Sequence, residues 1–282
     1  LTMQQQRTFY NNILPLNTEE HKDLRLKIDN NFSIFSNTNA LPIAGVEFIE
    51  ASREHAIAFI NYQEEGIIPV YILGLRDNEN LLLDDENNWK YRYIPAFVRR
   101  YPYIMVEPNE DGNSVVCIDA DYEGINHPDG ELIFTKKDGE IKPTPQLEAA
   151  MDMLKDFNAQ LTRTREFTKR LEEFDLLKEI SPQINLADGR EFSIGGIYTI
   201  DEEKLLKLED EKALTLYRSG EMAWIYNHLA SISNLIRLAE HLPADAKAPN
   251  KKEKSIKKTN GTKKVTSIKK KKVTKKDKET LH

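Results

Sequence analysis

The residues best suited to chemistry lie in one short segment, residues 91–103, where tyrosines and a phenylalanine alternate with arginines. Arginine presents a planar fork of N–H donors that pairs with carboxylate or phosphate groups and stacks on aromatic rings. We therefore form the hypothesis that Arg99 and Arg100, flanked by Tyr93 and Tyr101, bind an anionic ligand or a partner surface. The alternative is structural: one arginine pairs with a carboxylate of the protein and the tyrosines pack.

Two histidines stand in a pattern that resembles a metal site only weakly. His127 and Asp129 have the His-x-Asp spacing of non-haem iron oxygenases, and His228 and Arg237 could be offered as further members of such a site. The same spacing recurs at residues 21–23, so the pattern arises easily without function. We therefore predict no metal ion and no cofactor.

Acidic residues gather at 84–86 and again at Asp119 and Asp121, and carboxylates are the ligands that calcium prefers. Neither run has the spacing of an EF-hand loop, so solvated loops are the favoured interpretation. The chain also has no glycine-rich phosphate loop and no Gly-x-Ser-x-Gly nucleophile elbow. No catalytic residue is predicted, and the sequence favours a protein that acts by binding.

The last 39 residues differ sharply from the rest of the chain. Residues 244–282 hold fifteen lysines, no arginine and four acidic residues, a charge of +11, so the preceding 243 residues carry −17 of the total of −6. So few large apolar residues cannot offset chain entropy, which predicts a disordered tail. Its dense lysines could contact a polyanion through phosphates or carboxylates without reading sequence; they are Lys269, Lys270, Lys271, Lys272, Lys275 and Lys276. A merely solvated tail and docking on the acidic body are the alternatives.

The remaining composition bounds the compartment. Cys117 is the only cysteine, so no disulfide can form within the chain, and its apolar neighbours predict a buried structural thiol. The polar residues 1–10 lack the apolar segment of a secretory signal, and no apolar run is long enough to span a membrane. We expect a cytoplasmic location, or alternatively a cell-surface location reached without a Sec signal.

The pattern of apolar residues predicts an α+β fold: a mixed or antiparallel sheet region at 41–140, then a mainly helical half at 146–243. A short helix on the sheet is expected within 42–55, strands at 56–61, 68–75, 103–107, 114–119 and 131–135, and a hairpin-like unit at 184–198. Apolar residues recur every three or four positions through 146–180 and 221–242, which predicts helices there. A first short helix is expected near 18–28, capped by Asn17 or Thr18, and another after Asp201.

Residues 91–102, Tyr-Arg-Tyr-Ile-Pro-Ala-Phe-Val-Arg-Arg-Tyr-Pro, resemble the signature of the SapC family of bacterial proteins. Shorter pieces agree in order; they include Leu41-Pro42-Ile43, Leu73-Gly74-Leu75, Cys117-Ile118-Asp119 and His228-Leu229. The resemblance covers about residues 9–240 and excludes the lysine tail. It implies a bacterial protein linked to the cell envelope, in a family named for surface-layer gene clusters, and it carries over no catalytic residue.

These observations lead to one body, residues 1–243, and one tail, residues 244–282. We expect a non-enzymatic protein that binds an envelope or surface-layer partner. Two alternatives remain open: an enzyme or enzyme accessory that acts on envelope proteins or glycans, and polyanion binding by the tail. A pocket of convergent polar groups near Arg99 and Arg100 would favour an enzyme, whereas a flat aromatic face would favour a binding protein.

Overall fold

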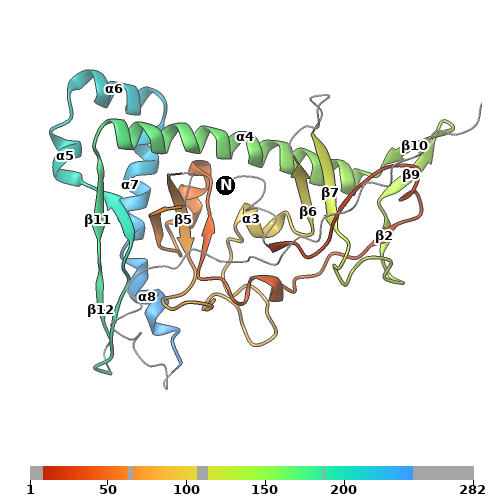
Figure 1. Ribbon diagram of the computed structural model, residues 1–282, viewed down its shortest axis with the longest axis horizontal. Coiled ribbons are helices and arrows are strands. Elements are labelled where there is room, and N and C mark those ends of the chain that lie inside the picture. The colour runs from red at the N-terminus through yellow and green to blue at the C-terminus, as the bar shows by residue number, and fades with distance from the viewer. Residues whose placement is uncertain (1–8, 63–65, 107–113, 187, 244–282) are drawn as a thin grey trace, which may run out of the picture.

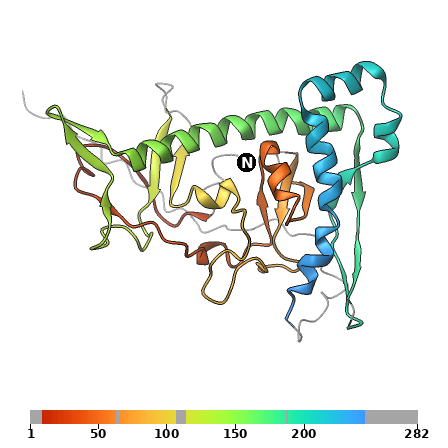
Figure 2. The same cartoon turned by 180° about the vertical axis from the view of Figure 1, so that it is seen from behind.

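The computed structural model describes residues 9–62, 66–106, 114–186 and 188–243 of the chain. Its longest element is the helix α4 (Pro145–Glu173), which runs along the length of the molecule above the strands in Figure 1. The helices α5 (Glu202–Leu206) to α8 (Asn234–Glu240) gather at one end of α4. The hairpin of β9 (Phe134–Lys137) and β10 (Glu140–Pro143) lies at the other end (Figures 1 and 2).

The larger sheet has five antiparallel strands in the order β11-β14-β4-β5-β3. They are β3 (Ala40–Pro42), β4 (Ile57–Asn61), β5 (Ile67–Ile72), β11 (Leu177–Ile180) and β14 (Ile197–Ile200). Nearly every residue of β4 and β5 is buried, because both faces of these strands are covered, and this explains their continuous apolar sequence. Tyr198 of β14 pairs with Phe59 of β4, so strands from the two halves of the chain share one sheet.

A second, antiparallel sheet has the order β1-β7-β6. Its strands are β1 (Ile13–Pro15), β6 (Tyr103–Val106) and β7 (Val115–Asp119). Ile118 in the central strand is fully buried and pairs with Leu14 on one side and Tyr103 on the other. Two-stranded pairs join β2 (Arg25–Leu26) to β8 (Glu131–Leu132), β9 to β10, and β12 (Gln183–Asn185) to β13 (Glu191–Ser193).

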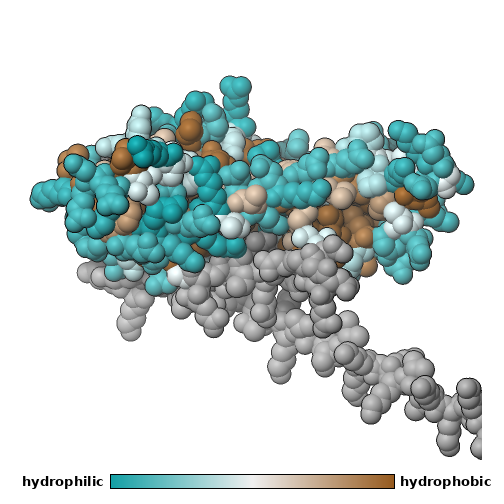
Figure 3. All heavy atoms as spheres, turned by 90° about the horizontal axis from the view of Figure 1, so that it is seen from above, coloured by the Kyte–Doolittle hydropathy of each residue, from teal (hydrophilic) through white to brown (hydrophobic). Residues whose placement is uncertain are grey.

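The helix α4 connects two hydrophobic cores. Its buried apolar residues recur every three or four positions and therefore lie on one face. Leu147 and Leu154 pack in the core around the three-stranded sheet, whereas Phe167 and Leu171 belong to the core that includes the five-stranded sheet. The opposite face of α4 is polar, and hydrophilic residues cover most of the described surface that is visible from this side (Figure 3).

Short helices fill the connections between the strands, and a helical unit closes the described chain. The connecting helices are η2 (Ser33–Phe35), η3 (Gly45–Glu47), α2 (Phe48–Ala51) and α3 (Ala96–Arg99). The unit comprises α5, α6 (Asp210–Arg218), α7 (Glu221–Ser231) and α8. Asp201 begins it, because its carboxylate accepts hydrogen bonds from the backbone N–H groups of Glu203 and Lys204 at 3.1 and 3.2 Å.

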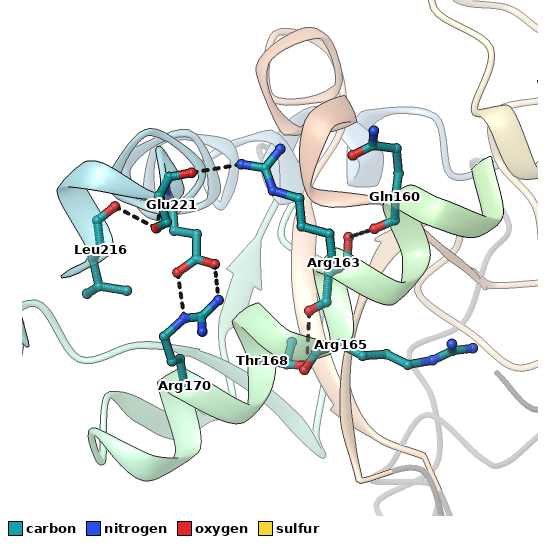
Figure 4. A network of polar contacts seen from close by, with 9 residues as sticks. Gln160, Arg163, Arg165, Thr168, Arg170, Leu216 and Glu221 are labelled. Atoms are coloured by element: carbon teal, nitrogen blue, oxygen red, sulfur yellow. Dashed lines mark hydrogen bonds and ion pairs between the residues drawn. The ribbon is translucent and has the colours of Figure 1, made fainter. Parts of the chain in front are cut away.

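Two arginines of α4 hold this helical unit in place (Figure 4). Arg170 donates two hydrogen bonds to the carboxylate of Glu221, at 2.9 and 2.6 Å. Arg163 donates to the carbonyl oxygen of Ser219 at 2.8 Å, and its guanidinium lies 4.5 Å from the ring centroid of Trp224. The turn between α6 and α7 is therefore fixed to α4 by charge-assisted hydrogen bonds and a cation–π contact.

The predicted α+β fold is confirmed, with most strands in the first half and most of the helical residues in the second. The short helix on the sheet appears as η3 and α2, and the hairpin-like unit appears as β12 and β13. The predicted burial of Cys117 is confirmed, since its exposed fraction is 2%. The predicted disorder of residues 244–282 lies outside the described residues.

The prediction of a helix near residues 18–28 is wrong. The side chain of Asn17 does accept hydrogen bonds from the backbone N–H groups of Glu19 and Glu20, but only a turn follows. Arg25 and Leu26 instead pair with β8. Pairing with a distant strand therefore overrides the local capping signal.

Two predicted helices have different limits in the structure. The first ends at Glu173, because Asp175 adopts a positive φ of 54° and Leu177–Ile180 pairs with β14. The second divides into α7 and α8 at residues 232–233. There, Ser231 Oγ donates to the carbonyl oxygen of His228 and accepts from the N–H of Ile57, so side chain–backbone bonds compete with the helix.

Candidate functional site

The signature segment 91–102 is tied to the protein through two buried carboxylates. The hydroxyl of Tyr93 and the N–H of Ala96 each donate to Glu47 Oε1 at 2.8 Å. The hydroxyl of Tyr101 faces Asp119 Oδ2 at 3.4 Å, a longer hydrogen bond. Two of the four predicted site residues, Tyr93 and Tyr101, therefore use their hydroxyl groups to fix this segment to η3 and β7.

Glu47 receives these bonds in the core. Its exposed fraction is 6%, and its other oxygen accepts from the N–H of Ala44 at 3.0 Å. Burial raises the pKa of Glu47 above its usual value, although the hydrogen bonds from Ala96, Ala44 and Tyr93 favour the ionised form. Burial and the nearby Glu47 carboxylate also raise the pKa values of the Tyr71 and Tyr93 hydroxyls.

The two arginines that were predicted to act together lie in different surroundings. Arg100 is 2% exposed, and its guanidinium lies 4.1 Å from the ring centroid of Phe97 and 5.4 Å from that of Phe157. Burial lowers the pKa of Arg100. Arg99 is exposed, donates to the carbonyl oxygen of Ile94 at 2.9 Å, and lies 6.0 Å from the ring centroid of Tyr93. Binding of an anion by these arginines stays a prediction, and Arg99 is the member of the pair that solvent reaches.

Tyr101, near the end of the signature segment, is partly exposed at the surface. Asp119 below it is fully buried and accepts from the N–H groups of Asn11 and Asn12 at 3.0 Å each. The ring of Tyr101 packs against Tyr122 with centroids 5.4 Å apart and planes at 87°. Burial raises the pKa of the Tyr101 hydroxyl. The contact of its hydroxyl with Asp119 and the packing of its ring against Tyr122 therefore hold the Tyr101 side chain in one orientation.

A surface pocket of about 230 Å³ opens beside this ring. Its lining consists of Asn11, Asp29, Asn31, Ser33, Ile34, Tyr101, Asp121, Tyr122 and Glu123. Tyr101 is the predicted site residue that the pocket includes, and Asp121 was considered as a calcium ligand. The other lining residues were not predicted, because they come from two segments about ninety residues apart that the pairing of β1 with β7 brings together.

The walls of this pocket are held by their own hydrogen bonds. Tyr122 donates its hydroxyl hydrogen to Asp29 Oδ1 at 3.2 Å and accepts from the N–H of Asp29 at 3.0 Å. Asp29 Oδ1 also accepts from the N–H of Asn31, and Asn31 Oδ1 accepts from the N–H of Ser33 at 2.9 Å. Burial raises the pKa of Tyr122 to about 12, so its hydroxyl is neutral. The pocket therefore exists before any ligand enters.

The histidines of the weak iron pattern have other contacts. His127 Nδ1 accepts from the N–H of Asp129 at 3.1 Å in a surface turn. His228 is fully buried, and its Nε2 lies 2.9 Å from Thr199 Oγ1; burial lowers the pKa of His228 to about 3. Within the described ranges, no group of three or more His, Cys, Asp or Glu side chains could hold a metal ion.

Comparison with known proteins decides the family. The SapC family model matches residues 16–238, which include the signature segment and the pocket residues from Asp29 onward. The chain belongs to the SapC family. No curated protein and no solved structure matches this SapC chain.

Two further predictions bear on where this SapC protein could act. Across the described part of the chain, no helix combines the length and apolarity needed to cross a membrane. The six tail lysines that were predicted to contact a polyanion lie outside the described residues.

Proposed function

We propose that this SapC protein is a non-enzymatic binding protein linked to the bacterial cell envelope, and that its ligand enters the pocket beside Tyr101. The observation that carries the proposal is the preformed pocket, in which rings and hydrogen-bonding groups converge at one surface. Sites that bind small ligands combine such apolar walls with a few fixed polar groups. The envelope link rests on the family, whose name comes from surface-layer gene clusters.

The described lining of the pocket lacks the groups that activate a serine or cysteine nucleophile. It contains no His, Cys, Lys or Arg among the described residues, and Ser33 is its one aliphatic hydroxyl. Nucleophilic catalysis by a serine needs a base within hydrogen-bond reach that is itself oriented by a third group. The buried His228 instead contacts Thr199 and the N–H of Ile200 in the core.

An occlusion variant tests this function. Glu123 lines the pocket, is exposed and has no hydrogen bond or ion pair among the described residues, so Glu123→Trp fills the opening without removing a contact. The matched control is Glu211→Trp on the exposed face of α6. Co-sedimentation of the full chain with an envelope fraction from a bacterium that carries a surface layer measures binding. We expect Glu123→Trp to lower the binding constant about tenfold, equivalent to about 1.4 kcal/mol, and the control to bind as the unmodified chain does.

Two results overturn the proposal. Equal binding by Glu123→Trp and the unmodified chain shows that the pocket is not the ligand site. Release of shortened glycans or peptides from the envelope fraction by the unmodified chain, but not by the occluded variant, replaces the binding protein with an enzyme or enzyme accessory. That enzyme is the alternative that the family resemblance left open.

Polyanion binding by the tail is a second candidate function, carried by the fifteen lysines of residues 244–282. We propose that this tail and the body at 1–243 act as separate units. A tail of this charge attracts any polyanion, and its affinity falls steeply with salt. Truncation after Pro243 tests it: the shortened chain should lose binding to DNA and to anionic vesicles at low salt but keep binding to the envelope fraction through the pocket. Unchanged binding after truncation excludes the tail.

A further inference from the structure

The pocket beside Tyr101 has a lining whose chemistry narrows the class of ligand. We infer that it takes a saccharide, one sugar ring of a glycan, and this inference rests on the proposed binding function. The volume of about 230 Å³ lies below the range of about 300–1,000 Å³ for sites of drug-sized ligands. A single ring with several hydroxyl groups is the scale of ligand that such a pocket holds.

The polar atoms that remain open toward the pocket match the hydroxyls of a sugar. Asp29 Oδ1 and Asp121 Oδ1 already accept hydrogen bonds, whereas the second oxygen of each carboxylate has no hydrogen-bond partner in the described part of the chain. Asn31 uses its Oδ1 for the N–H of Ser33, which leaves its Nδ2 as a donor. A sugar hydroxyl both donates and accepts, so it can use carboxylate, amide and serine groups together.

The aromatic walls supply the complementary apolar surface. Tyr101 and Tyr122 meet nearly at right angles, with planes at 87° and ring centroids 5.4 Å apart, and so form a corner. The face of an aromatic ring carries partial negative charge, which attracts the C–H groups on the flat side of a pyranose. Ile34 also lines the pocket and adds apolar surface. One side of the ligand can therefore be apolar while its edge meets the polar groups.

The carboxylates favour a ligand that has several separate hydrogen-bond donors over a single compact cation. Asp29, Asp121 and Glu123 all line the pocket, yet no three acidic groups of the described residues converge closely enough to hold a metal ion. Separate acceptors around a cavity suit separate hydroxyls. An ammonium or guanidinium group would also be attracted by the negative charge, so it is the competing ligand in the experiment.

Saturation-transfer difference NMR on the full chain tests the ligand class. The probes are the methyl glycosides of glucose, galactose and N-acetylglucosamine, with lysine amide and arginine amide as cationic competitors. At least one glycoside should receive saturation at its ring C–H protons, and Glu123→Trp should reduce that signal about tenfold while Glu211→Trp does not. Because the sugar is uncharged, the signal should persist from about 0.01 M to about 1 M salt, although the Debye length shortens from about 30 Å to about 3 Å.

Further variants separate the outcomes. Asp121→Asn keeps the shape but replaces a charged acceptor with a neutral one. It should therefore weaken a glycoside by the same factor at low and at high salt, but weaken a cationic ligand mainly at low salt. Binding of the amides alone, lost at high salt, overturns the saccharide and leaves the proposed binding function standing. Failure of every probe overturns the saccharide as well, and the envelope co-sedimentation then decides the proposed function separately. Glycoside binding that survives in Glu123→Trp places the sugar elsewhere and overturns the assignment of this pocket.

Discussion

Arg170 of α4 and Glu221 at the start of α7 form a two-pronged ion pair in which Arg170 Nε and Nη2 each donate to one carboxylate oxygen, at 2.9 and 2.6 Å. The side chain of Glu221 is 1% exposed and that of Arg170 is 29% exposed. The pair therefore connects a buried anion to a cation that water still reaches. It joins the helix that spans both cores to the helical unit at its end.

Replacing Glu221 should destabilise the protein substantially. Breaking a buried ion pair costs about 3–5 kcal/mol, and partial solvation of Arg170 places Glu221→Ala near the lower end of that range. The free energy of unfolding in urea measures the loss. Glu211→Ala on the exposed surface of α6 is the matched control and should change it by less than about 0.5 kcal/mol. Equal effects of the two substitutions would mean that the ion pair does not anchor α7.

The parts of the fold that depend on local pattern could be predicted from the sequence. The spacing of Leu147, Leu154 and Leu171 places them on one face of α4. The apolar runs of β4 and β5 predict strands even when the strands that pair with them are unknown. Near the N-terminus two patterns competed. Leu24 and Ile28 have helical spacing, but buried Leu24 and Leu26 flank exposed Arg25, which is the alternation of a strand.

The pocket could not be predicted in the same way. Asp29 and Tyr122 are 93 positions apart, and only the folded chain brings the carboxylate to the hydroxyl. The signature segment drew notice because of its arginines, yet Arg100 packs between rings in the core while Tyr101 reaches the pocket. Residue type alone does not distinguish a buried arginine from a binding one, because burial depends on packing with α4.

The two arginines of the signature segment should respond differently to substitution. Arg99→Ala removes an exposed side chain and should change the free energy of unfolding by less than about 0.5 kcal/mol. Arg100→Ala removes a buried guanidinium from the faces of Phe97 and Phe157, a contact worth about 2 kcal/mol when desolvated. Urea unfolding of the two single variants checks this difference, and similar losses would contradict the assigned surroundings.

The same pair of variants tests the anion hypothesis. If Arg99 binds an anionic partner, Arg99→Ala should weaken binding of the full chain to that partner without a loss of stability. Titration with inorganic phosphate, followed by the chemical shift of the arginine side-chain N–H groups, provides the readout. An Arg99→Ala, Arg100→Ala double variant that folds and retains all binding would remove both arginines from any site.

Glu47 should make stability depend on pH in a direction opposite to that of most carboxylates. Its pKa in the folded protein lies above the ordinary value of 4.5, so the folded state binds the proton more tightly than the unfolded state does. The stabilising contribution of the protonated carboxyl is complete below pH 4.5 and is lost as the pH rises through the raised pKa. Glu47→Gln cannot ionise, so the difference in unfolding free energy between the two proteins should change across this window and be constant above it. The ordinary carboxyl pKa is about 4. A difference in unfolding free energy that is already constant from this pH upward would contradict the raised pKa of Glu47.

His228 predicts a second pH dependence, of opposite sign. Burial lowers its folded-state pKa to about 3 from the ordinary 6.5, so the unfolded state binds the proton first as the pH falls. The stabilising contribution of neutral His228 is complete above pH 6.5 and is lost progressively as the pH falls toward 3. Relative to His228→Gln, the unmodified chain should lose about 1.4 kcal/mol for each pH unit within that window. His127→Gln in the surface turn is the control and should not alter the slope, because that ring lies outside the core. The unfolding free energy of His228→Gln could instead have the same pH slope as that of the unmodified chain. The buried ring would then take up its proton in the folded state, with its surroundings at Thr199 intact.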